Sequence, residues 1–156
     1  IILFMENPGI KVVTTNKKAS FNYFLSNFLE VGIELTGTEI KSIKLHNVSL
    51  SDSYIVFKNG EAFILNMNIS VYEKGTIYNH DPLRTRRLLM HKNEILKFEQ
   101  KTIKEGYTVV PTKLYIKKGL AKLEIALAKG KNLYDKRETI KERDDARNMA
   151  KALKRE

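Results

Sequence analysis

The chain contains no cysteine and no tryptophan, and only 3 prolines among its 156 residues. Without cysteine there can be no disulfide, thiolate nucleophile, zinc ribbon or iron–sulfur cluster. The three histidines, His46, His80 and His91, stand far apart and show no spacing typical of a metal site. We therefore expect no bound metal and no cofactor, and many classes of enzyme are excluded.

Long apolar runs are also missing. No segment approaches the roughly 18 apolar residues needed to cross a bilayer. The apolar start, Ile1 to Phe4, is too short for a secretory signal and lacks its basic flank. We expect a cytoplasmic protein with no membrane partner, built as one domain plus an appendage.

Positive charge is what the chain has in excess. The 28 lysines and arginines outnumber the 18 aspartates and glutamates, which gives a formal net charge of +10. A charge of this size favours a polyanionic partner such as a nucleic acid. The alternative is a basic surface that is merely solvated, and charge alone names no RNA.

The N-terminal third predicts a strand followed by a helix. Residues 1–15, which include Pro8-Gly9, are expected to be a flexible N-terminus. The apolar and alternating pattern over Phe21 to Leu29 and Val31 to Gly37 predicts a long bent strand. A short helix is expected over Glu39 to Lys44, because Ile40 and Ile43 are three residues apart and share one helix face. Thr38 is expected to be its N-cap.

Two hairpins are predicted further along. The apolar runs 54–57 and 62–65 flank Asn59-Gly60, a strong hairpin signal because both residues tolerate positive φ. The runs 107–116 and 120–128 alternate about the basic tip Lys117-Lys118-Gly119. Between the hairpins, Pro82 in a first turn and the apolar positions that follow predict one or two helices extending to Gly106.

Several short antiparallel strands with flanking short helices indicate a mainly β protein. We predict a small antiparallel OB-fold-like barrel over residues 16–128, the oligonucleotide-binding type being common at this size. Residues 129–156 carry ten basic and six acidic residues but few apolar ones. They predict a basic C-terminal tail that is disordered alone, and its capping-box pattern, Asp135 to Glu138, would allow a helix on a partner surface. The alternative is a solvated tail that binds no partner.

The segment Gly32 to Lys44, GIELTGTEIKSIK, resembles the signature of the SsrA-binding protein family, also called small protein B. Further matches follow in the same order, and colinear agreement of many motifs is far more specific than one short pattern. They are Asn16–Ala19, Asp52–Tyr54, Gly60–Ala62, Asp81–Pro82, Arg84–Leu89, Gly106–Pro111, Ala128–Lys131, Asp135–Arg137 and Ile140–Arg143.

This resemblance implies a function. It implies an RNA-binding adaptor that binds the tRNA-like domain of transfer-messenger RNA and delivers it to stalled ribosomes for trans-translation. Elongation factor Tu would take part indirectly, through the RNA. The tail would fold as a helix in the empty messenger channel. We expect a monomer that is not an enzyme.

The expected RNA-contacting residues have two sources. The resemblance indicates Glu30, Leu89 and Lys122, and local chemistry adds the neighbouring residues Asn16, Lys17 and Lys18. Lysines would neutralise phosphates, Leu89 would cover a sugar or splayed base, and Glu30 would accept from a base amino group. Leu89 could equally be a core residue, and Glu30 and Lys122 ordinary surface residues. The expected ribosome-binding residues of the tail are Lys129, Lys131, Asp135, Lys136, Arg137, Ile140, Lys141 and Arg143.

Two positions depart from the family pattern. Phe21 stands where the family often has a histidine, and the loop from Leu45 to Val48 lacks the family's usual glycine.

Two other functions stay open. A magnesium-dependent nuclease would have to recruit Asp52, Glu61, His80 and Asp81, whose spacing indicates no preorganised site. A generic ribosome-binding or initiation-factor-like barrel would bind ribosomal subunits without preferring the tRNA-like domain. Tyr54, Phe57, Phe63 and Tyr107 are expected to pack in the core or between strands, and the alternative is a platform on which bases stack.

Overall fold

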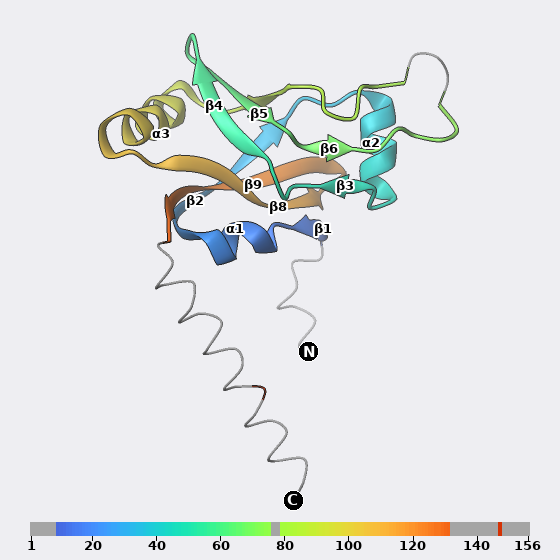
Figure 1. Cartoon of the computed structure of the whole chain (residues 1–156). Coiled ribbons are helices and arrows are strands. Elements are labelled where there is room, and N and C mark those ends of the chain that lie inside the picture. The colour runs from blue at the N-terminus through green and yellow to red at the C-terminus, as the bar shows by residue number, and fades with distance from the viewer. Residues whose placement is uncertain (1–8, 76–78, 132–146, 148–156) are drawn as a thin grey trace, which may run out of the picture.

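The computed structural model describes residues 9–75, 79–131 and 147, and the structural statements below concern these residues. Seven strands build one large antiparallel sheet (Figure 1). Its strands are β1 (Ile10–Thr15), β2 (Tyr23–Ile33), β4 (Tyr54–Lys58), β5 (Glu61–Leu65), β7 (Arg86–Leu89), β8 (Thr108–Lys117) and β9 (Leu120–Gly130). A small second sheet pairs β3 (Val48–Ser49) with β6 (Asn68–Ile69).

The large sheet closes on itself. Its strand order is β1-β8-β4-β5-β7-β2-β9, and β8 also pairs with β9. Six strands therefore form a ring, with β1 added on the free edge of β8. The predicted mainly β fold, a small antiparallel barrel with short flanking helices, is confirmed.

Alternating apolar residues fill the inside of the barrel. Val31, Leu114, Leu123 and Ile125 are at most 3% exposed, and they come from the neighbouring strands β2, β8 and β9. Because successive strand residues point to opposite faces, the residues between them lie on the outside of the barrel.

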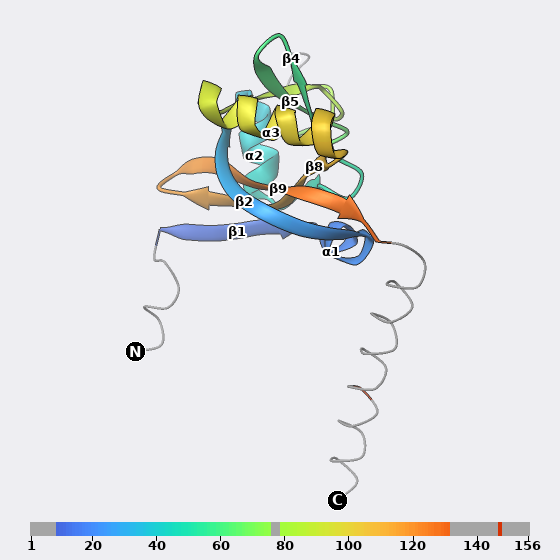
Figure 2. The same ribbon diagram turned by 90° about the vertical axis from the view of Figure 1, so that its left-hand side faces the viewer.

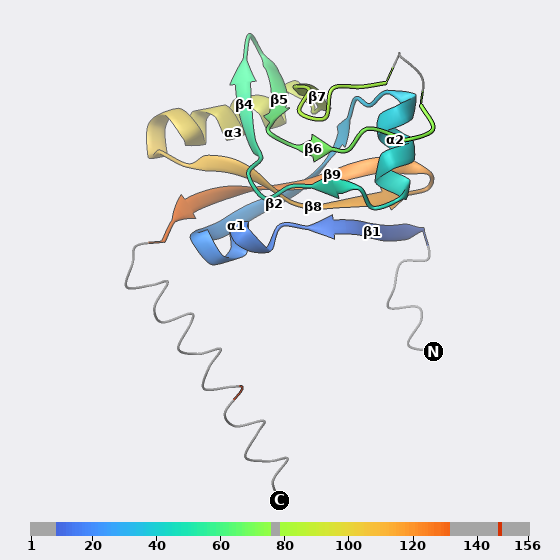
Figure 3. The ribbon, with the colours of Figure 1, turned by 45° about the vertical axis from the view of Figure 1, so that its right-hand side comes forward.

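Three helices surround the barrel within the described residues. They are α1 (Lys17–Asn22), α2 (Gly37–Lys44) and α3 (Lys92–Glu105). Figures 1 and 3 show α2 and α3 at opposite ends of the barrel, with α1 beneath it beside β1. Figure 2 shows β2 curving across the barrel, so that its two ends serve different surfaces. No helix in this part of the chain is long and apolar enough to span a membrane.

Both predicted hairpins are confirmed. Asn59 and Gly60 turn between β4 and β5 with φ of 55° and 76°, and Lys118 and Gly119 turn between β8 and β9 with φ of 51° and 79°. Such left-handed pairs match the twist of the adjoining strands.

The prediction of a flexible start is wrong for the part of residues 1–15 that the structure describes. Ile10 to Thr15 form β1, which pairs with β8 from Ile10 opposite Lys117 to Thr15 opposite Lys113. β1 gains its stability from this non-local pairing and buries Val13. The predicted long strand is also shorter than expected, because Lys17 to Asn22 form α1 and β2 begins only at Tyr23.

The predicted cap of α2 is wrong by two residues. Thr36 is the N-cap: its hydroxyl accepts from Glu39 N (3.4 Å), and its own N–H donates to the Glu39 carboxylate (2.8 Å). This reciprocal capping box starts the helix at Gly37. Thr38 instead bonds His80 Nδ1 through its hydroxyl (2.9 Å).

Helical structure does not begin at Pro82. Residues Arg86–Leu89 form β7, and α3 starts only at Lys92 and ends before Gly106, which adopts φ of 69°. The strand was missed because an arginine, Arg86, occupies an inward position and is 0% exposed. Its charge hides the alternation that would otherwise indicate a strand.

Candidate nucleic-acid interface

The predicted residues Leu89 and Lys122 lie in one row on the outside of the barrel. Gly32 on β2 is paired with Leu89 of β7 on one side and with Lys122 of β9 on the other. A Cβ on Gly32 would lie 3.2 Å from Leu89 Cβ and Cδ1, so Leu89 rests against the bare backbone of Gly32. Leu89 is 49% exposed, which rules out the reading of Leu89 as a core residue.

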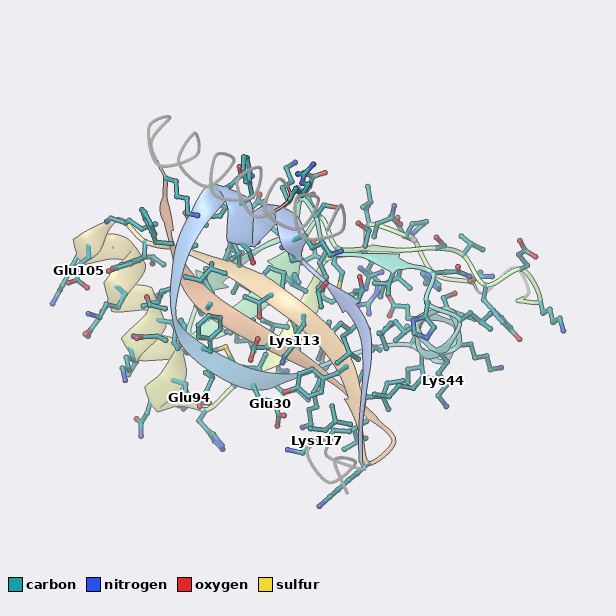
Figure 4. All side chains as sticks on the ribbon, turned by 90° about the horizontal axis from the view of Figure 1, so that it is seen from below. Glu30, Lys44, Glu94, Glu105, Lys113 and Lys117 are labelled. Atoms are coloured by element: carbon teal, nitrogen blue, oxygen red, sulfur yellow. The ribbon has the colours of Figure 1, made fainter. Side chains whose placement is uncertain are left out.

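Glu30 extends this row on the same face of β2, two residues before Gly32. The Tyr115 hydroxyl on β8 donates to the Glu30 carboxylate across β9, and Lys117 Nζ lies 3.5 Å from the same oxygen. Figure 4 shows Glu30 and Lys117 beside each other on the underside of the barrel. Glu30 is therefore held in place and is not a freely solvated acid.

These contacts set the charge of Glu30. The hydrogen bond from Tyr115, together with the charges of Lys117 and Lys122, lowers the pKa of Glu30 below its ordinary value. Burial and the adjacent carboxylate raise the pKa of Tyr115, so that its hydroxyl keeps the proton it donates. At neutral pH Glu30 is thus an ionised acceptor with lysines around it.

The outer face of this end combines groups suited to RNA. Leu89 offers apolar cover, Glu30 an acceptor, and Lys113, Lys117 and Lys122 positive charge. Lysines on such a face neutralise phosphates, whereas a carboxylate can accept from a base amino group. We call Glu30, Gly32, Leu89, Tyr115, Lys117 and Lys122 the β2 face.

A buried ion cluster supports the β2 face from the start of β7. Arg86 Nε lies 2.5 Å from the Glu39 carboxylate, Arg84 lies 2.7 Å from it, and Glu39 and Arg86 are fully buried. Burial would raise the pKa of Glu39, but the hydrogen bonds from Arg84, Thr36 and Arg86 outweigh it and leave the pKa at about 2. The cluster fastens α2 to β7, and Leu89 is the last residue of β7.

Asn16 is not available to RNA, so the prediction that its side chain contacts RNA is wrong. It is 5% exposed and caps α1, accepting from Ala19 N (3.1 Å). Its amide group donates to Pro111 O (2.8 Å) and Leu50 O (3.2 Å). These bonds tie α1 to β8 and to the segment before β4.

Lys17 and Lys18 are exposed but lie away from the β2 face. They precede the start of β2, whereas Gly32 is near its end, about 30 Å further along at roughly 3.3 Å per residue. Lys18 also pairs with Asp52 (2.7 Å), whose hydrogen bond and charge raise the pKa of Lys18. Lys17 and Lys18 therefore form a separate basic area.

Of the predicted tail residues, the structure describes Lys129 and Lys131. Both lie at the α1 end of the barrel, where Lys129 still pairs with Phe24 of β2. The other six, Asp135, Lys136, Arg137, Ile140, Lys141 and Arg143, lie outside the described residues, as does the predicted helix of the tail.

Three members of the β2 face were missed by the sequence reasoning: Gly32 as part of the site, Tyr115 and Lys117. Tyr115 belongs to an alternating strand in which an aromatic residue normally indicates packing. The register of β8 with β9 was the signal that could have found it, because Tyr115 is paired with Lys122.

The two departures from the family pattern have defined places. Phe21 lies in α1. His46 follows α2 with φ of 62°, the left-handed conformation that usually favours glycine, and its Nδ1 lies 3.0 Å from Val13 O.

Phe57 and Tyr107 pack against the core as expected, but Tyr54 is 38% exposed.

The residues that a nuclease would need serve the fold in different places. Asp52 pairs with Lys18, and Asp81 Oδ1 accepts from Leu83 N (3.0 Å). His80 is 8% exposed, with its ring nitrogens 2.9 Å from Thr38 Oγ1 and 2.8 Å from Ile69 O. Among the described residues, no three acidic or histidine side chains gather into a metal-binding group.

A closed antiparallel barrel with basic and apolar side chains on one outer face has the architecture of a nucleic-acid-binding barrel protein. Residues 13–155 match the model of one protein family, described as SmpB protein. The chain belongs to the SmpB family.

Individual relatives agree with this. The SsrA-binding protein of Malacoplasma penetrans (strain HF-2) is 54% identical over 145 residues, which cover 93% of this chain and 99% of the relative. The SsrA-binding protein of Caldicellulosiruptor bescii is 52% identical over 149 residues, 96% of this chain and 94% of the relative.

A solved structure is also similar. It is described as "tmRNA-SmpB: a journey to the center of the bacterial ribosome" and matches with a TM-score of 0.65 and 39% identity. The match covers 77% of this chain and 85% of that chain.

Proposed function

We propose that this chain is an RNA-binding adaptor that binds the tRNA-like domain of transfer-messenger RNA and delivers it to stalled ribosomes for trans-translation. The name of the relatives, SsrA-binding protein, and the description of the similar solved structure, which mentions tmRNA-SmpB and the bacterial ribosome, support the RNA partner and the ribosome. The observation that carries the proposal is the β2 face, where Leu89, Gly32 and Lys122 lie in one row beside Glu30 in a member of this family.

Each group has a distinct task in this proposal. Lys122 and Lys117 neutralise phosphates without reading sequence, Leu89 covers a sugar or an unstacked base, and Glu30 accepts from a base amino group. Lys17 and Lys18 form a second basic area near the start of the tail. The tail residues Asp135, Lys136, Arg137, Ile140, Lys141 and Arg143 are proposed to meet the ribosome in its empty messenger channel.

The remaining features follow from this role. The protein acts as a monomer in the cytoplasm, reaches elongation factor Tu only through the RNA, and catalyses no reaction. Purified protein with Mg²⁺ should therefore leave RNA intact, and cleavage lost in Asp52→Asn or Asp81→Asn would favour the nuclease instead.

Sequencing the RNA that copurifies with the protein tests the proposal most simply. Transfer-messenger RNA should dominate the recovered RNA, and Leu89→Ala should reduce its share while Leu96→Ala, an exposed leucine on α3, should not. Recovery of ribosomal RNA alone would favour the generic ribosome-binding barrel.

A further inference from the structure

The last strand continues beyond the point at which the tail was expected to begin. β9 keeps its pairing with β2 to the end, with Lys129 opposite Phe24 and Gly130 opposite Tyr23. Lys131 N then donates to Asn22 O (2.9 Å), at the end of α1. The backbone is therefore held to α1 and β2 as far as Lys131, three residues past Ala128.

Lys129 fastens this strand to α3. Its ammonium donates to the backbone carbonyl of Glu105, the last residue of the helix, and lies 4.6 Å from the centre of the Tyr107 ring. The last carbonyls of a helix lack partners within it and form its negative end. A lysine here satisfies such a carbonyl and gains a cation–π contact.

Lys131 makes a similar contact with α1. Its Nζ lies 3.3 Å from Ser20 O and 5.3 Å from the centre of the Phe24 ring. The Ser20 carbonyl is in the last turn of α1, where no further helical N–H follows to bond it. Each lysine thus joins a helix C-terminus to an aromatic ring.

We propose that Lys129 and Lys131 are positioning residues that fix the point and direction in which the tail leaves the barrel. Their ammonium groups are committed to α3 and α1, so they do not serve as contacts to ribosomal RNA phosphates. This inference rests on the proposed function, because it assigns the tail a task on the ribosome.

The effect of such an anchor is on effective concentration. A segment that starts at a fixed place and direction samples a smaller volume than one that swings from Ala128. Fixing the first residues therefore raises the concentration of the following tail residues at their site on the ribosome without any new contact there.

A distance measurement tests the anchor directly. Because the chain has no cysteine, Gln100→Cys on α3 and Asn132→Cys accept two spin labels without further changes. The distance distribution should be at least twofold broader in Lys129→Met/Lys131→Met than in the parent. The control is Lys58→Met/Lys97→Met, which removes the same charge from two exposed positions. A distribution as narrow as that of the control would overturn the proposal.

Activity assays on the same variants separate positioning from RNA contact. Lys129→Met/Lys131→Met should keep its affinity for the tRNA-like domain within about twofold and lose at least tenfold in tagging on stalled ribosomes. Loss of tagging with an unchanged distance distribution would mean that the lysines bind RNA phosphates, and the proposal would be wrong. If the unsubstituted protein supports no tagging, the proposed function fails, whereas the distance measurement still decides where the tail is anchored.

Discussion

Gly32 lies between Leu89 and Lys122, and its missing side chain determines where Leu89 rests. Its φ is not in the left-handed region, so an alanine there meets no backbone strain and only the side chain of Leu89. We predict that Gly32→Ala displaces the half-exposed Leu89 by a few tenths of an ångström. Binding to the tRNA-like domain should weaken by about 1 kcal/mol, and the Tm of the protein should change little.

Gly37→Ala is the matched control for this variant, because nothing lies within 4 Å of an added Cβ at Gly37. Titration calorimetry of both variants checks the prediction. Equal affinity of Gly32→Ala and Gly37→Ala would show that the position of Leu89 does not matter for RNA binding.

Tyr115 offers a second prediction at the level of single residues. Tyr115→Phe removes the hydroxyl that donates to Glu30, so the pKa of Glu30 should rise toward its ordinary value. NMR titration of the carboxyl group measures this shift. RNA binding should weaken as well, because Glu30 is then held by Lys117 and no longer by the Tyr115 hydroxyl. An unshifted pKa in Tyr115→Phe would show that Lys117 and Lys122 alone hold the charge.

Three residues of the β2 face were predicted from the sequence. Glu30, Leu89 and Lys122 were indicated by resemblance, and the structure places them together. Asn16 belongs to the same motif as Lys17 and Lys18, yet its amide is used inside the fold. A short polar residue before a helix serves a cap as readily as a ligand, and only its burial distinguishes the two.

At the scale of elements, the ion cluster of Glu39, Arg84 and Arg86 joins α2 to β7 and makes a prediction about pH. The pKa of Glu39 is about 2 in the folded protein and lies below its ordinary value. Its contribution to stability is therefore complete above about pH 4.5 and is lost as the pH falls toward 2. The loss should be on the order of 3 kcal/mol.

Urea denaturation at a series of pH values measures this contribution. Glu39→Gln should flatten the pH dependence and destabilise the fold by about 3 kcal/mol or more, because it leaves Arg86 buried without its counter-charge. Glu94→Gln, the corresponding capping-box residue of α3, should cost less than about 1 kcal/mol. A parent protein whose stability is constant from pH 5 to pH 2.5 would contradict the role of the cluster.

Elements with local signals were predictable, and those that depend on distant partners were not. The two hairpins are specified by Asn59-Gly60 and Lys118-Gly119, whose positive φ is a local property. β1 needs the edge of β8, about a hundred residues away, and β7 hides its alternation behind Arg86. Both strands therefore became clear only from the closed sheet.

At the scale of the whole molecule, the net charge of +10 implies a strong dependence of RNA binding on salt. The logarithm of the association constant should fall with the logarithm of salt concentration by roughly 0.7 to 0.9 per phosphate neutralised. Lys122→Ala should weaken binding by about 1 kcal/mol and reduce the slope by about one phosphate. Fluorescence titrations over a range of salt concentrations measure both quantities.

Lys58 is the last residue of β4 and lies away from the β2 face. Lys58→Ala removes one positive charge, as Lys122→Ala does, and is therefore the control. It should change neither the affinity nor the slope by more than a small fraction of the effect of Lys122→Ala. A slope near zero for the parent protein would contradict the electrostatic account altogether.

The two basic ends of the barrel suggest that RNA binding and action on the ribosome can be separated in one chain. The β2 face lies toward the end of β2, whereas the tail leaves at Lys131 beside the start of the same strand. The most direct measurement is therefore made on protein cut after Lys131, which retains both lysine anchors. The truncated protein should bind the tRNA-like domain within about twofold of the full chain but support no tagging on stalled ribosomes. Full tagging activity without the tail, or loss of RNA binding together with tagging, would contradict this division of the molecule.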